Sequence, residues 1–111
     1  MTFEELKRRA EMFYLDKEKN IKIPFSDGAF ERTVEPPHLM FTDIDTNNVP
    51  ADNKVIYETY NSRLELTTDY RDRRLEKRIK EEILKDVYYK EKITYISNEK
   101  IWNVSYFFET K

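Results

Sequence analysis

The sequence contains no cysteine and a single glycine, Gly28. A chain without cysteine has neither a disulfide framework nor a thiolate metal site, which is typical of proteins that work in a reducing cytoplasm. Loops that bind phosphate groups use several glycines, because their backbone amides must come close to the phosphate. The sequence therefore excludes dinucleotide-binding folds and P-loops.

Histidine, long apolar runs and excess charge are also scarce. His38 is the only histidine, and catalytic triads or histidine-ligated metals need companions that this sequence lacks. No apolar run approaches the roughly 20 residues that cross a bilayer, and the charged N-terminus has no signal-peptide core. Twenty basic and 22 acidic residues nearly cancel, which leaves no basic face for nucleic acid.

These scarcities narrow the class of protein. We expect a protein used inside a cell, with no cofactor, no metal, no membrane partner and no specific nucleic-acid partner. We also expect no enzymatic activity. Residue counts alone leave a two-carboxylate hydrolase open, because acidic residues are numerous. Most of them alternate with basic neighbours, however, which is typical of a solvated surface.

Two segments have the pattern of amphipathic helices. Residues 2–16 begin with a capping box, in which Thr2 is the N-cap and Glu5 its reciprocal partner. Residues 72–85 begin with Asp72, a good N-cap, and their apolar residues recur every four positions. That spacing places Leu75, Ile79 and Ile83 on one helix face.

The remaining periodic segments alternate as strands do. They are residues 21–25, 38–42, 55–68, 89–95 and 101–108, with a turn at residues 97–100. Along the strand expected at residues 55–68, the apolar residues change from one face of the strand to the other. We therefore expect a bulge near Asn61 and Ser62. Residues 1–111 thus form a single α+β domain of order α-β-β-β-α-β-β. The sheet is mostly antiparallel with two helices on one face, and the expected core contains Leu66, Leu75, Ile79, Ile83, Trp102 and Val104.

A polar loop is expected at residues 43–53. Its Asp-x-Asp-x-Asn start imitates a calcium loop, but Asn48 replaces the required glycine and Lys54 the final glutamate. We therefore expect no metal here. The loop is long for a hairpin connection, and loops of that length are often functional. The residues that we expect to contact other proteins are Asp43, Asp45, Asn47, Asn48 and Asp52.

The second helix carries a cluster of basic residues. The cluster is interleaved with Asp72, Glu76 and Glu81, which neutralise it. Contact with an acidic partner is one interpretation, and a solvated helix face is the favoured one. The cluster consists of Arg71, Arg73, Arg74, Lys77 and Arg78.

Several blocks of the sequence together carry a resemblance to a known family. They are Glu5-Leu6-Lys7, Pro36-Pro37, residues 51–55, residues 64–69, Leu75-Glu76, residues 89–92, residues 94–96, residues 99–102, residues 104–106 and Phe108-Glu109. These blocks resemble a family of small minor structural proteins of long, non-contractile-tailed phages of Gram-positive bacteria, the tail-completion or tail-to-head joining proteins. The closing block carries the resemblance best, and the match covers residues 36–109 well and the first helix loosely.

The resemblance implies a ring-forming connector at the head-proximal end of the tail. Its implied partners are phage tail-tube and neck or connector proteins, with a ring-shaped homo-oligomer in the assembled particle. Its location would be the virion, and the host cytoplasm during assembly. No catalytic motif is carried over. Two alternatives stay open: a head-side connector of the same neck, and a small phage protein that binds a host factor.

Overall fold

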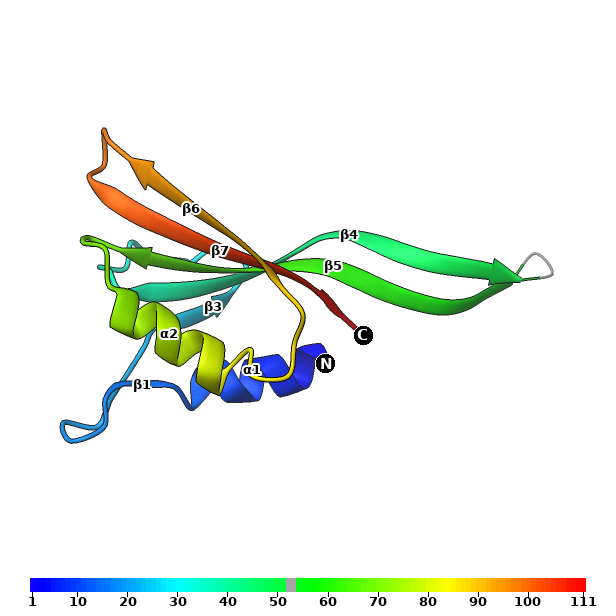
Figure 1. The fold of residues 1–111 in the computed structure, drawn as a ribbon, viewed down its shortest axis with the longest axis horizontal. Coiled ribbons are helices and arrows are strands. Elements are labelled where there is room, and N and C mark those ends of the chain that lie inside the picture. The colour runs from blue at the N-terminus through cyan, green and yellow to red at the C-terminus, as the bar shows by residue number, and fades with distance from the viewer. Residues whose placement is uncertain (52–53) are drawn as a thin grey trace.

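A five-stranded sheet with two helices on one face organises the chain (Figure 1). The computed structural model describes residues 1–51 and 54–111. The order of elements is α1 (Phe3–Glu11), β1 (Tyr14–Asp16), β2 (Ile21–Lys22), β3 (Phe25–Asp27), β4 (His38–Ala51), β5 (Lys54–Thr68), α2 (Arg73–Glu82), β6 (Lys90–Ile96) and β7 (Ile101–Thr110). The expected α+β class and order are confirmed, with the small β1–β2 pair added.

The large sheet has the strand order β3-β4-β5-β7-β6. Its β4–β5, β5–β7 and β6–β7 pairs are antiparallel, and only β3 pairs in parallel, with β4. Because β5 and β6 are both antiparallel to β7, they run parallel to each other, and α2 connects them across the sheet. The expected turn at residues 97–100 joins β6 to β7, and Lys100 within it has a φ of 56°.

Both helices begin at the expected N-caps. The Oγ1 atom of Thr2 accepts a hydrogen bond from the Glu5 amide at 3.2 Å, and the Oδ1 atom of Asp72 accepts one from the Leu75 amide at 3.1 Å. The carboxylate of Glu5 binds the guanidinium groups of Arg8 and Arg9.

The expected end of α1 at residue 16 is wrong. The helix ends at Glu11, and residues 14–16 form β1. The Phe13 carbonyl accepts from the Ile23 amide at 3.1 Å, so a contact distant in sequence ends the helix early.

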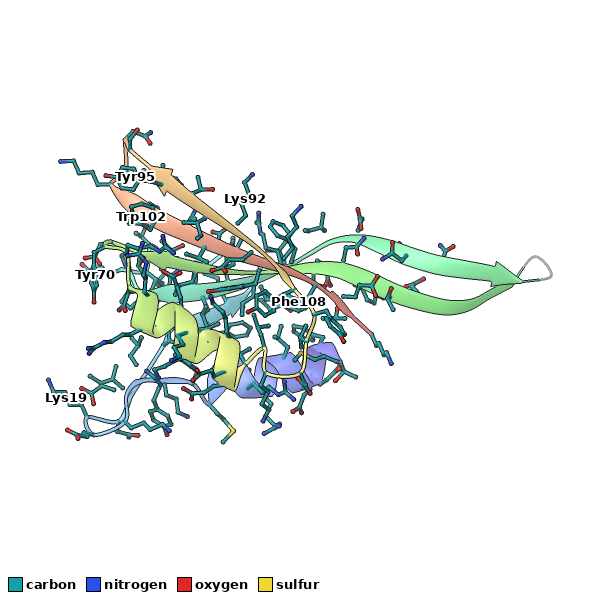
Figure 2. All side chains as sticks on the ribbon, viewed as in Figure 1. Lys19, Tyr70, Lys92, Tyr95, Trp102 and Phe108 are labelled. Carbon is teal, nitrogen blue, oxygen red and sulfur yellow. The ribbon has the colours of Figure 1, made fainter. Side chains whose placement is uncertain are left out.

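The core lies between the two helices and the sheet. Five of the six expected members are buried there, and Trp102 is the exception. Trp102 is only half-buried and packs against the Tyr95 ring at a centroid distance of 4.9 Å. Both residues lie near the left-hand end of the sheet (Figure 2). The core residues are Leu6, Ala10, Phe13, Ile23, Leu39, Phe41, Leu64, Leu66, Leu75, Ile79, Ile83, Leu84, Val104, Tyr106 and Phe108.

The expected polar loop at residues 43–53 is wrong for residues 43–51. These residues form the outer half of β4 and pair with β5 up to Ala51 and Lys54. The expected bulge is present, because the β4–β5 register shifts between Asp43 and Asp45, opposite Ser62 and Asn61. The additional residue is Ile44 on β4 rather than a residue of β5.

Candidate functional site

The outer halves of β4 and β5 form a two-stranded arm that projects from the domain (Figure 1). We define the arm as residues 46–51 and 54–59. Within the described chain, β3 pairs only with residues 39–41 of β4, and β7 ends opposite Tyr60. The arm strands therefore pair only with each other. At about 3.3 Å per residue, six residues span about 20 Å.

A network of polar side chains holds the root of the arm. The Nδ2 atom of Asn47 donates to Asn61 Oδ1 at 2.9 Å and to Glu109 Oε1 at 3.2 Å. The Nδ2 atom of Asn61 donates to the carboxylate of Asp45 and to Asn47 Oδ1. Side chains from β4, β5 and β7 thus meet at the position where the sheet narrows to two strands.

A second group of hydrogen bonds lies on the domain side of the bulge. The hydroxyl of Ser62 donates to Asp43 Oδ1 at 2.8 Å and lies 2.9 Å from the hydroxyl of Thr110. Ser62 and Thr110 are buried, and the Lys111 amide donates to the Met1 carbonyl at 2.9 Å. The root is therefore tied to β7, and the residue after β7 is tied to Met1. In the described part of the chain, the strands of the arm beyond the root pair only with each other.

An open hollow of 650 Å³ lies at the root of the arm. Its apolar lining includes Ile44, Val87 and Phe108, and its acidic lining includes Asp45 and Glu109. The bulge contributes to it directly, since Ile44 is 51% exposed there.

The expected interaction residues have different positions. Asp43, Asp45 and Asn47 come together at the root, where each makes a hydrogen bond within the chain. Asn48 lies on the arm and is exposed. Asp52 lies outside the described residues.

Sequence reasoning missed the partners of these residues. They come from β5 and β7, which are separated from β4 in sequence by up to 62 residues. Polar residues within an otherwise apolar strand pattern were the available signal. The missed residues are Asn61, Ser62, Glu109 and Thr110.

Two members of the basic cluster, Arg71 and Arg78, are partly buried rather than fully solvated as expected. Arg71 makes a bidentate pair with the buried carboxylate of Glu76, at 2.7 and 3.0 Å. Arg78 donates to the Tyr14 carbonyl at 2.6 Å and lies over the Phe13 ring at 4.6 Å. The exposed members are Arg73, Arg74 and Lys77.

Strand β6 forms the sheet edge opposite β3. Its seven residues pair with β7 on one side only within the described chain. Ile93 and Tyr95 lie on the same face of the sheet as Trp102, which pairs with Tyr95. Both apolar side chains are exposed there, Ile93 by 42% and Tyr95 by 47%. Lys90 and Lys92, which point to the other face, are exposed as well. Glu91 is bound by Lys80 at 3.3 Å.

His38 lies at the start of β4, beside the Phe30 ring at 5.0 Å. Burial lowers the pKa of His38, and the nearby Glu65 carboxylate opposes that shift. Among residues 1–51 and 54–111, no three His, Cys, Asp or Glu side chains are placed to hold a metal ion. The helices of that same part of the chain are too short and too polar to cross a membrane.

Comparison with known proteins found no family model and no curated protein sequence that matches this chain.

Proposed function

We propose that this protein is a phage virion assembly protein of the neck, a tail-completion or head-tail joining connector. It acts by protein–protein contacts, without a catalytic site, and the arm makes the principal contact. The resemblance to tail-completion proteins, carried by the blocks between residues 36 and 109, supplies the biological setting. The arm supplies the physical support.

The arm supports a binding role because, within the described chain, its two strands pair only with each other. A two-stranded ribbon is marginally stable in water unless a helix or a further strand packs on it. Natural proteins avoid long free strand edges, since these pair with other chains. Here two such edges extend about 20 Å from the domain (Figure 1). The polar network of Asp45, Asn47 and Asn61 fixes the direction of the arm, so a partner would meet it already oriented.

The identity of the neighbouring genes is the first test of the proposed role in the phage neck. Portal, head and tail-tube genes on both sides would support the connector. A gene among early or host-interaction genes would favour the host-factor alternative instead.

The deciding experiment shortens the arm and keeps its root. Asn47 and Thr59 face each other in the ladder, so residues 48–58 can be replaced by Asn-Gly, which forms a two-residue hairpin turn. The hydrogen bonds of Asp45, Asn47 and Asn61 stay in place. We expect the purified variant to keep its circular dichroism spectrum, and phage carrying it to accumulate unjoined heads and tails in electron micrographs.

The matched control shortens the other hairpin. Ile96 and Ile101 face each other across the turn, so residues 97–100 can also be replaced by Asn-Gly. Phage carrying this control should assemble normally. Joined, infectious particles from the arm-shortened phage would refute the proposed role of the arm.

A further inference from the structure

Strand β6 is an open edge of the sheet that the proposed role of the arm does not use. It is the outermost strand in the order β3-β4-β5-β7-β6 and, within the described residues, pairs only with β7 (Figure 1). At about 3.3 Å per residue, its seven residues present an edge of about 23 Å. Alternate residues of an edge strand turn their amide and carbonyl groups outward, where an added strand can satisfy them. The edge is therefore long enough to accept one more strand.

The two faces of β6 differ in chemistry. Ile93 pairs with the core residue Val104, so Ile93 and Tyr95 point to the side of the sheet that the helices cover. Lys90 and Lys92 point to the opposite side, because side chains alternate along a strand. All four side chains of β6 named here are exposed. The edge is thus apolar on one face and basic on the other.

The two lysines are not neutralised within the described chain. The β7 residues that pair with Lys90 and Lys92 are uncharged. Among the described residues, neither ammonium group forms an ion pair with a carboxylate. Glu91 points to the helix side and is bound by Lys80 at 3.3 Å. The basic face of β6 therefore favours a partner that brings negative charge.

The exposed apolar residues distinguish this edge from one that is only protected. Ile93 is 42% exposed and Tyr95 47% exposed. The Tyr95 ring packs against the ring of Trp102, as Figure 2 shows at the left-hand end of the sheet. Lysines on an edge strand commonly hinder unwanted pairing, but that effect does not require large apolar side chains along the same edge. The combination indicates an edge that rejects most strands and admits one kind.

We propose that β6 is a docking strand for an extended segment of another protein in which acidic and apolar residues alternate. The segment adds to the sheet beside β6, with its acidic side chains opposite Lys90 and Lys92 and its apolar side chains over Ile93 and Tyr95. Hydrogen bonds between the main chains supply affinity, and the alternation of side chains supplies specificity. This inference goes beyond the proposed function of the arm and does not depend on it.

The other open edge of this chain does not carry the matching pattern. That edge is the outer half of β4, beyond the residues that pair with β3. Its Asp43 and Asp45 pair with Ser62 and Asn61, which are consecutive in β5 and so point to opposite faces. Such a strand brings only one of its two carboxylates to the lysine face of β6. The charge pattern therefore favours a different protein over a second copy as the partner.

Two heptapeptides of equal composition test the alternation. The probe is Thr-Val-Thr-Val-Glu-Thr-Glu, acetylated and amidated at its ends. Paired antiparallel to β6, it places valine opposite Tyr95 and Ile93 and glutamate opposite Lys92 and Lys90. The control peptide, Val-Thr-Val-Thr-Glu-Thr-Glu, carries all of its valine and glutamate residues on one face, so no register matches both faces of β6. Titration into the full chain, followed by NMR chemical shifts of the backbone amides, measures the binding of each peptide.

The probe should bind better than the control peptide. We expect the probe to shift the amide signals of β6 with a Kd of about 1 mM or tighter. It should bind about tenfold more tightly than the control peptide, because the control forms favourable cross-strand pairs on only one face at a time. Binding of the probe should weaken as salt rises from about 0.1 M to about 1 M, since the Debye length falls from about 10 Å to about 3 Å.

Charge exchange assigns the contact to the two lysines. The variant Lys90→Glu, Lys92→Glu should bind the probe about tenfold more weakly and should instead bind Thr-Val-Thr-Val-Lys-Thr-Lys, because like charges across a strand pair repel and opposite charges attract. Binding of this exchanged peptide also shows that the variant is folded. The matched control Lys17→Glu, Lys19→Glu makes the same charge change in the exposed turn between β1 and β2 and should bind the probe as the unchanged protein does.

Several results would overturn the inference. They are the absence of β6 shifts at probe concentrations up to about 1 mM, equal binding of the two peptides of equal composition, and unchanged probe binding by the Lys90→Glu, Lys92→Glu variant. A change in the β6 signals when the protein alone is diluted would show that a second copy occupies the edge, which would refute the assigned partner. The arm-shortened protein should bind the probe normally, so the outcome here is separate from that of the arm experiment in phage.

Discussion

The substitution Ile79→Ala tests how α2 is held on the sheet. Ile79 is fully buried and belongs to the core cluster. Alanine keeps the backbone carbonyl that accepts from the amides of Ile83 and Leu84, so the helix ladder survives and only side-chain packing changes. The substitution removes three carbon atoms, which at about 0.8 kcal/mol for each buried methylene amounts to about 2.4 kcal/mol. The cavity left behind raises the expected loss into the range of about 2–5 kcal/mol.

Urea unfolding followed by circular dichroism measures this loss directly. The free energy of unfolding should fall by that amount with an unchanged dependence on urea, and Tm should fall by about 10 °C or more. Lys77→Ala is the matched control, since Lys77 is exposed on the same helix and its change should stay within about 0.5 kcal/mol. A loss below about 0.5 kcal/mol for Ile79→Ala would show that this face of α2 does not pack on the sheet.

Three further substitutions test polar groups. Tyr106 is fully buried, burial raises its pKa, and its hydroxyl has no hydrogen-bond partner among the described residues. Tyr106→Phe should therefore keep or raise the free energy of unfolding. A loss above about 1 kcal/mol would contradict this expectation. Hydrogen bonds from Arg8 and Arg9 lower the pKa of Glu5, and one from Arg9 lowers that of Asp86. Because these folded-state pKa values lie below the unfolded ones, the two ionised carboxylates stabilise the fold above about pH 5, and this contribution is lost as the pH falls below it. Arg9→Met should therefore make the free energy of unfolding depend less on pH in the acid range. An unchanged stability–pH profile would refute the role of Arg9. Asn61→Ala removes the centre of the root network, so amide hydrogen exchange should accelerate in residues 46–48 and not in α2; equal rates in the two proteins would show that the network does not hold the arm.

The root network also separates the proposed contact from its support. Asp45 and Asn47 were expected to bind other proteins, and the structure shows that both bind Asn61 within the chain. Asn61→Ala is therefore expected to loosen the arm without removing it, whereas replacing residues 48–58 by Asn-Gly removes the arm and keeps the root network. Comparing the two variants distinguishes a loss of support from a loss of contact.

Local patterns in the sequence determined the parts of the fold that depend on near neighbours. The N-caps Thr2 and Asp72 are correct because a cap requires only a side chain and an amide three residues later. The buried face of α2 is correct because the helical period alone places Leu75 and Ile79 together. The strand order along the chain and the position of the bulge followed from alternation and its change of phase.

Contacts between segments distant in sequence decided the rest. Residues 43–48 are mostly polar and were expected to form part of a loop. They are strand because pairing with β5 satisfies their backbone groups on both sides of the bulge at Ile44. Trp102 is on the expected strand, but its burial depended on which neighbours lie over it. Its ring packs against the Tyr95 ring and lies beneath the Arg71 guanidinium, and it stays half-buried. The tertiary structure alone decided which strand edges are unpaired in the described chain, namely that of β6 and that of the outer half of β4. A strand lies at an edge when no other strand pairs with one of its sides, and local sequence does not determine which strands become neighbours.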